Sequence, residues 1–538
     1  MTTRATGEAA YRDGTGAFVP REVRVVRGQD LRGDVHTTVD ACVIGTGAGG
    51  AVLAKELAEG GMSVAMLEEG DHHTADDYTA RVRDMSLRLY RDAGQVFTVG
   101  APPILLPLGR AVGGTTQINS ATCFRTPDAV LARWRERFGL DELTPAEMDP
   151  WFRRVERELN VSQTPPDVAG RNAEVVKRGV DRLGWSGDFI YRNVRGCVGS
   201  GVCNFGCPTS AKQHVGITYV PRAWDAGALT YTGTRARRLL HSGGRVRGVE
   251  ARAASGASVT IDADLVVLAA GAIHSPLFLR RQELAGIAEN GQLGANLTIH
   301  PATAARALFD EEIDMSTGVP QSYFVDEFAD EGIMLEGAAA TPEYAAMSLP
   351  FVGAPHRELM ERYRNLSQFG VMVSDSARGR VDERAGQVTI RYDLADADRD
   401  RFHRGLEVLT EIYWAAGAKQ VFLPVGGLPV LEEGDVESLR RYPLRSEELT
   451  LSAFHPLGTC RMGASPTDSV VGVDGSPHGV EGLVVADGSI VPSSLGVNPQ
   501  ITIMALATRI AFGILGRPAP LDEPEPEHMA EPRVTVAH

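Results

Sequence analysis

Three glycines and a glutamate near the start of the chain have the types and spacing that bind a dinucleotide. Gly45, Gly47 and Gly50 form a G-x-G-x-x-G, and Glu68 follows about twenty residues on. The first glycine permits a tight turn, the second lets backbone approach a pyrophosphate, and the third lets a helix and a strand pack closely. The helix N-terminus then faces the phosphates, while the carboxylate accepts from a ribose hydroxyl. This stretch fits NAD and FAD equally.

A glycine-rich loop carries three further residues that could do chemistry. Cys197, Cys203 and Cys207 have the spacing C-x5-C-x3-C, with Pro208 directly after them. Three thiolates in such a loop suit an iron–sulfur cluster, and free thiols are the main alternative. Zinc is a poorer fit because it usually takes a fourth protein ligand, and a disulfide is also less favoured. The scattered cysteines are interpreted as buried packing or motif neighbours: Cys42, Cys123 and Cys460.

The glycine cluster lies in one strand–turn–helix–strand pattern. An apolar run at 41–44 precedes it, a helical pattern follows, and a second apolar run at 64–67 ends at Glu68. Further along, the segment GRAVGGTTQIN at 109–119 has paired glycines that would let backbone approach a ligand. Its Thr115, Thr116 and Asn119 offer short polar contacts there.

The rest of the chain alternates between nucleotide-type and less patterned sequence. Helices are expected over 74–91 and most of 128–183, and strands over 229–268. A helix is expected from Ser275, with Pro276 in its first turn. Antiparallel strands and helices are expected over 301–445, and a strand, a loop and a helix ending near Ile514 close the pattern.

This order predicts one nucleotide domain assembled from separated segments, with a substrate domain built from the insertions. The predicted boundaries are a polar arm at 1–36, a cofactor domain at 37–120, 194–300 and 446–516, a substrate domain at 121–193 and 301–445, and a disordered tail at 517–538.

Composition limits the possible partners. The 538 residues carry a formal charge of −15, which argues against nucleic acid or an anionic membrane. The first forty residues lack the apolar core of a secretory signal. No stretch approaches the length that a membrane span needs. A cytoplasmic enzyme is therefore expected.

Six segments, in order, resemble the glucose–methanol–choline (GMC) oxidoreductases, which are FAD enzymes that oxidise alcohols. The segments are VIGTGAGG, GRAVGGTTQIN with Arg125 after it, AAGAIHSP, GANLTIHP, HPLGTCRMG and ADGSIVPSSLGVNPQIT. The resemblance spans about residues 38 to 515 and favours FAD over NAD. It implies an α/β (overall α+β) fold, in which a Rossmann-like three-layer FAD domain carries an inserted antiparallel-sheet substrate domain.

The resemblance also implies which residues hold FAD. The glycine turn and Glu68 would hold the ADP half, the segment at 109–119 would line the flavin and pyrophosphate, and the last segment would contact the ribityl chain and ring. The implied cofactor residues are Gly45, Thr46, Gly47, Ala48, Gly50, Glu68, Arg110, Gly113, Gly114, Thr115, Thr116, Asn119, Ala236, Asp487, Gly488, Asn498 and Pro499.

His455 and Asn498 stand at the family's catalytic positions. Oxidation of an alcohol needs a base for the hydroxyl proton while hydride passes to flavin N5, and imidazole is the natural base. An asparagine cannot act as a base, but its amide can orient the hydroxyl or donate to a developing alkoxide. His455 is therefore assigned as general base and Asn498 as its partner. His300 also matches a family position and is interpreted as structural, as are His274 and His478.

The cysteine loop bears on where the electrons go. It resembles the loop of bacterial FAD glucose dehydrogenase flavin subunits that binds a [3Fe-4S] cluster, although an extra cysteine often present in such loops is missing here. With a cluster, electrons leave singly to a quinone or redox protein, and the enzyme is an alcohol dehydrogenase. Without one, reaction with O2 makes it an alcohol oxidase. Two other functions stay open: a hydroxynitrile-lyase-like, non-redox flavoprotein, and a non-catalytic electron-transfer subunit.

Overall fold

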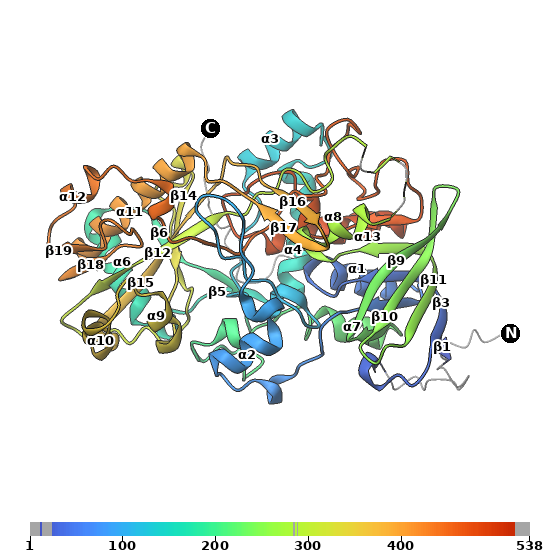
Figure 1. Ribbon diagram of the computed structural model, residues 1–538, viewed down its shortest axis with the longest axis horizontal. Helices are drawn as coiled ribbons and strands as arrows, with labels where there is room; N and C mark the ends of the chain where they lie inside the picture. Colours follow the sequence, from blue (N-terminus) through green and yellow to red (C-terminus); the bar gives the residue numbers. More distant parts are fainter. Residues whose placement is uncertain (1–10, 13–23, 283, 285, 288, 522–538) are drawn as a thin grey trace.

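The computed structural model describes residues 11–12, 24–282, 284, 286–287 and 289–521. Most of the predicted N-terminal arm and of the predicted C-terminal tail lies outside these residues. Two large sheets lie toward opposite ends of the molecule, each with its own helices (Figure 1).

The first sheet gathers strands that are far apart in the sequence. Its order is β2-β8-β4-β3-β11-β10-β9, and in addition β1 pairs with β3 and β21 pairs with β11. Strands β2 to β4, β8, β11 and β21 pair in parallel, whereas β10 is antiparallel to both β9 and β11. The strands are β1 (Tyr11–Arg12), β2 (Val25–Arg27), β3 (Val35–Ile44), β4 (Val64–Leu67), β8 (Leu229–Thr232), β9 (Thr234–Ser242), β10 (Arg245–Ala253), β11 (Ser258–Leu268) and β21 (Leu483–Val485).

The periodicity of β3 changes where helices begin to cover it. Alternate residues are buried from Val35 to Asp40, and then all four residues of 41–44 are buried, as in a strand covered on both faces. Its core is shared with several helices, among them α3 and α4, whose Trp134 and Trp151 belong to the same cluster. The helices of this half are α1 (Ala48–Glu59), α3 (Asp128–Phe138), α4 (Pro145–Glu158), α7 (Tyr219–Asp225), α8 (Gly271–Arg280) and α13 (Gln500–Ile514).

The second sheet is antiparallel throughout. Its order is β19-β18-β12-β15-β14-β13-β6, and β20 pairs with the start of β12. Its core includes the buried sides of α6 and α11. The elements are β6 (Gly187–Phe189), β12 (Pro301–Leu308), β13 (Tyr323–Val325), β14 (Ile333–Gly337), β15 (Leu366–Val373), β18 (Gln420–Phe422), β19 (Val430–Glu432), β20 (Ser452–Ala453), α6 (Arg171–Leu183) and α11 (Asp396–Ala416).

Shorter elements fill the space around the sheets. The segment expected to be helical over 74–91 contains an α-helix only at α2: Ala75–Asp77 is a 3-10 turn, and in the turn Arg91–Gly94 both Asp92 and Ala93 have a positive φ. The remaining elements are α2 (Val82–Leu89), α5 (Pro166–Ala169), α9 (Pro342–Ser348), α10 (Ala354–Glu361), α12 (Glu437–Arg440), β5 (Val161–Gln163), β7 (Tyr191–Asn193), β16 (Arg380–Arg384) and β17 (Gln387–Arg391).

One helix boundary differs from the prediction. Helix α8 begins at Gly271 rather than Ser275, and Pro276 lies inside it. The Asp487 carboxylate accepts from the N–H of Gly271 at 2.8 Å and from the hydroxyl of Ser275, and so caps the earlier start. A cap supplied from 216 residues away along the chain leaves no local signal.

The predicted substrate segment 121–193 divides between the two cores. Helices α3 and α4 pack with the first sheet, whereas α6 packs with the second. The division into domains stays a prediction. In the part of the chain that the structure describes, no helix is both long and apolar enough to cross a membrane.

Candidate active site

A cavity of about 1050 Å³ extends from the glycine turn beside the first sheet to strands β12, β14 and β15 of the second. Gly45 and Gly47 line one part, and His455 and Asn498 line another. Side chains of β12, β14 and β15 complete the wall around the histidine. The cavity therefore joins the two groups of residues that the sequence singled out, about 400 positions apart in the numbering.

The glycine turn leaves backbone open to this cavity. Gly45 has a φ of +95°, and a Cβ there would lie 2.4 Å from the Ala269 carbonyl oxygen. A Cβ on Gly50 would lie 2.0 Å from the Gly45 oxygen, so this glycine serves the packing of helix against turn. At Gly47 the nearest atom to a Cβ is the Cα of Gly114, at 4.0 Å. A side chain at Gly47 would project into space that the protein itself does not occupy.

Glu68 is held at the end of β4. Its Oε2 accepts from the backbone N–H of Thr46 at 3.2 Å and from the Thr46 hydroxyl at 2.6 Å, and its Oε1 accepts from the N–H of Gly70 at 2.8 Å. Burial raises the pKa of Glu68, although these three hydrogen bonds oppose that shift. The carboxylate is thus fixed beside the turn with its orientation set.

Most of the residues implied for the cofactor line this one cavity. Gly50, Arg110 and Gly113 do not: Gly50 packs against the turn, Arg110 pairs with Glu69, and Gly113 packs against Gly216. The implied residues that line it are Gly45, Thr46, Gly47, Ala48, Glu68, Gly114, Thr115, Thr116, Asn119, Ala236, Asp487, Gly488, Asn498 and Pro499.

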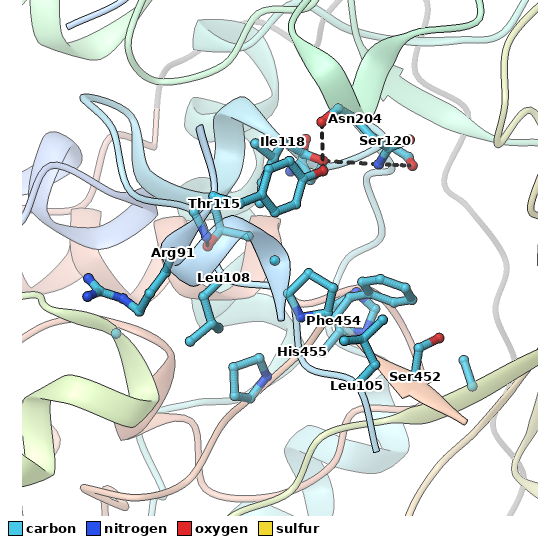
Figure 2. Close-up of a pocket in the computed structure, with 18 of the residues that line it drawn as sticks. Arg91, Leu105, Leu108, Thr115, Ile118, Ser120, Asn204, Ser452, Phe454 and His455 are labelled. Atoms are coloured by element: carbon cyan, nitrogen blue, oxygen red, sulfur yellow. Dashed lines mark hydrogen bonds between the residues drawn. The ribbon is translucent and has the colours of Figure 1, made fainter. Parts of the chain in front are cut away.

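The side chains of His455 and Asn498 lie next to each other in the wall of the cavity. His455 Nε2 lies 3.3 Å from Asn498 Nδ2, and within the described residues His455 Nδ1 has no hydrogen-bond partner. Burial, followed by the neighbouring His300, holds the pKa of His455 well below its usual range. The imidazole is therefore neutral near pH 7 and can accept a proton at Nε2. Figure 2 shows this ring beside Phe454 and Leu105.

His300 supports His455 from behind. The two rings meet edge to face, with centroids 5.3 Å apart. His300 Nε2 accepts from the N–H groups of Leu495 and Gly496 at 2.8 and 3.2 Å, which fixes the ring. Its backbone has a φ of +47° and is held by the Asp375 carboxylate, which accepts the N–H of His300 at 3.3 Å. These contacts agree with the structural role expected for His300.

Glu336 is a site residue that the sequence reasoning missed. It lies on β14, is 5% exposed and lines the cavity. Its Oε2 accepts from Asn498 Nδ2 at 3.4 Å and from the Gln321 amide, while Oε1 has no partner among the described residues. Burial raises the pKa of Glu336 to about 7, against the effect of the Asn498 hydrogen bond. An acid within the apolar strand IMLEG was the available signal.

His274 also lines the cavity, at the end near the glycine turn. Burial, followed by the Arg91 charge, lowers its pKa to about 3, so the ring is neutral. Its Nε2 lacks a hydrogen-bond partner within the described ranges. The sequence placed this histidine among the structural ones.

The cysteine loop forms a wall of the same cavity without bringing its thiols together as ligands. Asn204 donates to the Ile118 carbonyl at 3.0 Å and to the Ser120 hydroxyl at 3.3 Å, which ties the loop to the cavity wall (Figure 2). In the residues that the structure describes, no three His, Cys, Asp or Glu side chains are arranged to hold a metal ion.

Nitrogen donors contact all three sulfurs. Arg192 donates to Cys203 Sγ at 3.2 Å and lies 3.9 Å from Cys197 Sγ. The backbone N–H of Lys212 donates to Cys207 Sγ at 3.4 Å. The buried Lys212 ammonium donates to three backbone carbonyls, those of Gln117, Asn119 and Cys203. The other three cysteines are buried, which confirms their predicted packing role.

Comparison with known proteins gives consistent findings. Two family models described as GMC oxidoreductase match residues 86–302 and 375–507. An uncharacterised GMC-type oxidoreductase of Mycobacterium tuberculosis is 40% identical over 481 residues, which cover 88% of this chain and 75% of that protein. A long-chain-alcohol oxidase of Arabidopsis thaliana is 29% identical, over 88% of this chain and 67% of that protein.

The crystal structure of pyridoxine 4-oxidase from Mesorbium loti superimposes with a TM-score of 0.70 at 19% identity, covering 89% of this chain and 99% of that one. The likeness confirms the predicted fold class.

Proposed function

The chain belongs to the GMC oxidoreductase family, and from that premise we propose that it oxidises an alcohol with His455 as the base and Asn498 as its partner. Membership makes it an FAD-dependent dehydrogenase or oxidase that acts on CH–OH groups. The assignment of residues to roles is our own.

The cavity fits FAD on its own geometry. The turn at Gly47 is open, the first turn of α1 faces the cavity, and Glu68 lies at the end of β4, as a dinucleotide requires. We infer that the glycine turn and Glu68 hold the ADP half, and that Thr115, Asn119 and Pro499 lie against the flavin half. When bound, FAD supplies the oxidant that takes the hydride from the alcohol carbon.

The observation that carries the proposal is the 3.3 Å pair of His455 Nε2 and Asn498 Nδ2. A hydroxyl oxygen within about 3 Å of both atoms would give its proton to Nε2 and accept an N–H from the amide. Because His455 is neutral, its Nε2 carries a lone pair that can take that proton. The amide then donates to the oxygen as negative charge develops on it.

Glu336 acts as a positioning residue for this pair. Its Oε2 accepts the N–H of Asn498 and so fixes the amide that meets the hydroxyl. Ionised, its Oε2 is the stronger acceptor for that amide. Because burial raises its pKa to about 7, this help is present above pH 7 and is lost as the pH falls below it.

The substitution Glu336→Gln is expected to remove a pH dependence. In the wild type, the rate constant for anaerobic flavin reduction should fall below an apparent pKa near 7. In the variant the fall in rate at low pH should disappear. Above pH 7 the rate should be about tenfold lower than in the wild type, as for the loss of one charged hydrogen bond. Stopped-flow reduction from pH 5.5 to 9 measures both.

Stability supplies an independent check on that carboxyl. A folded-state pKa raised above the unfolded value means that the native state binds more protons between the two, so wild-type stability falls as pH rises toward 7. Glu336→Gln should therefore gain stability relative to wild type on going from pH 5 to pH 8. In the kinetic experiment, a rate that still falls below pH 7 in Glu336→Gln would mean that another group causes the pH dependence of the wild type.

The electron acceptor is left open between O2, a quinone and a redox protein. Among the described residues the three thiols are not arranged as a group that could hold a metal ion, so we route no electrons through the loop. The [3Fe-4S] cluster stays a prediction from the resemblance, and iron bound in stoichiometric amount to purified holoenzyme would support it.

The function is tested by an anaerobic panel of alcohols followed by bleaching of the flavin, repeated in air with peroxide detection. Long-chain-alcohol oxidases are among the relatives, and Phe97, Met347 and Phe454 present exposed apolar surface along the cavity. We therefore start the panel with primary alcohols that carry an apolar chain. Bleaching by a primary alcohol is expected. No bleaching by any alcohol, together with cyanohydrin cleavage, would favour the lyase alternative.

A further inference from the structure

Arg306 places a buried positive charge on the cavity wall. It lies on β12, is 5% exposed and lines the cavity. Within the described residues, its guanidinium has no carboxylate within ion-pair distance, and its Nε has no hydrogen-bond partner. Burial lowers its pKa to about 10, which leaves it charged near pH 7. Because a buried charge without a counter-ion is costly, this one calls for an explanation.

The strand register places Arg306 away from the catalytic pair but on the same sheet. Glu336 pairs with Gly370, which pairs with Ala304, so Arg306 lies one cavity-facing position further along β12. Two residues along a strand and two strand spacings across the sheet separate Arg306 from Glu336 by about 12 Å between Cα atoms. A single extended molecule can therefore reach both.

Several of the residues that line the cavity between these two positions are small or apolar. Gly370, Ala304 and Ala338 contribute small residues to the lining, and Leu349 and Pro350 add apolar surface to it. The polar groups reappear around Arg306. Gln368, its partner in register on β15, and Thr341 each keep a side-chain oxygen without a partner among the described residues. The lining thus includes small and apolar residues between the two positions, and Arg306 and Gln368 beyond them.

A purely structural role accounts for only some of the donors of Arg306. Arg306 donates to the carbonyl of Ser348 at 3.2 Å and to its hydroxyl at 2.6 Å, at the end of α9 (Figure 1). The partial negative charge of a helix C-terminus favours a cation there. It does not neutralise a whole charge, and it leaves Nε–H unused.

We propose that the alcohol substrate carries a carboxylate at the opposite end of an apolar chain, and that Arg306 binds that carboxylate. The inference rests on the proposed alcohol oxidation and names its substrate class as medium-chain ω-hydroxy acids. Guanidinium and carboxylate form charge-assisted, often paired hydrogen bonds, which would complete the donors left at Arg306. Thr341 lines the same cavity and keeps a hydroxyl without a partner among the described residues, whereas the Gln368 amide already donates to the Ala338 carbonyl at 2.6 Å.

The first test compares substrates on the wild-type holoenzyme. ω-Hydroxyoctanoate is expected to reduce the flavin with a kcat/KM at least about tenfold above that of its methyl ester, since a charged hydrogen bond is lost in the ester. Equal values for acid and ester would overturn the assignment of the carboxylate. Failure of both, and of octanol, would instead count against the proposed function.

The second test uses Arg306→Gln, with Arg178→Gln as the matched control. Arg178 also donates to the last carbonyl of a helix, Ala416 of α11, but it lies outside the cavity and pairs with Glu311. Arg306→Gln should lower kcat/KM for the hydroxy acid about tenfold or more and leave the methyl ester within about threefold. Arg178→Gln should change kcat/KM for neither substrate. Equal losses for acid and ester in Arg306→Gln would mean that the residue only supports α9.

Binding without turnover keeps the proposal testable if the variant folds poorly. Octanoate, which has no hydroxyl to oxidise, should raise the melting temperature of wild-type holoenzyme more than methyl octanoate does at equal concentration. Arg306→Lys, which keeps the charge, should retain part of this shift. An equal shift from methyl octanoate and octanoate in the wild type would overturn the proposal.

Discussion

His455→Ala is expected to slow the reduction of the flavin by substrate at least about a hundredfold, because a positioned base contributes about 10² to 10⁴ in rate. The imidazole has Nε2 at 3.3 Å from Asn498, and its pKa is held low by burial and by His300, so it is the neutral base within reach of a hydroxyl at that position. Anaerobic stopped-flow measurement of flavin bleaching, at saturating alcohol, reports this step directly.

A matched control is His478→Ala. His478 is half-buried and contacts the Ser469 hydroxyl through Nε2 at 2.9 Å, but it does not line the active-site cavity. Its loss should leave the reduction rate near that of wild type. If His455→Ala retains the rate to within about tenfold while FAD stays bound, the base is another group and Glu336 becomes the next to examine.

The second large effect is expected at the glycine turn, where Gly47→Val should remove the cofactor. The Gly47 backbone has a φ of −74°, which valine adopts, and a Cβ there would meet no protein atom nearer than 4.0 Å. The valine therefore enters the space that we assign to the pyrophosphate. Overpacking of about 3 kcal/mol would weaken FAD affinity by about a hundredfold.

The measurement is the ratio of flavin absorbance to protein after purification and dialysis, followed by titration of the apoprotein with FAD. Gly513→Val is the control, because a Cβ at Gly513 also meets no atom within 4 Å but projects from the end of α13, outside the cavity. A Gly47→Val protein that keeps its full flavin would show that the pyrophosphate lies elsewhere.

The sequence by itself determined the nucleotide turn and the fold class. Strands β3 and β4 pair in parallel along 41–44 and 64–67, so the turn, the helix and the acid after it form one unit within about thirty residues. Local motifs of this kind report their own geometry, since Gly45 needs its positive φ wherever the unit occurs. The family resemblance likewise named His455 and Asn498 from their flanking residues, and the structure brings both to one cavity.

Only the tertiary structure showed which other side chains share that cavity. Glu336 and Arg306 lie on β14 and β12, which flank β15 and each pair antiparallel with it, and a shift of register by one residue would turn either side chain to the opposite face. Burial by segments that are distant in the sequence sets their electrostatic states. It raises the pKa of Glu336 and lowers the pKa of Arg306. The three cysteines show the converse: they are neighbours in sequence, yet among the described residues they do not form a group that could hold a metal ion, because side-chain direction is set by packing and not by spacing.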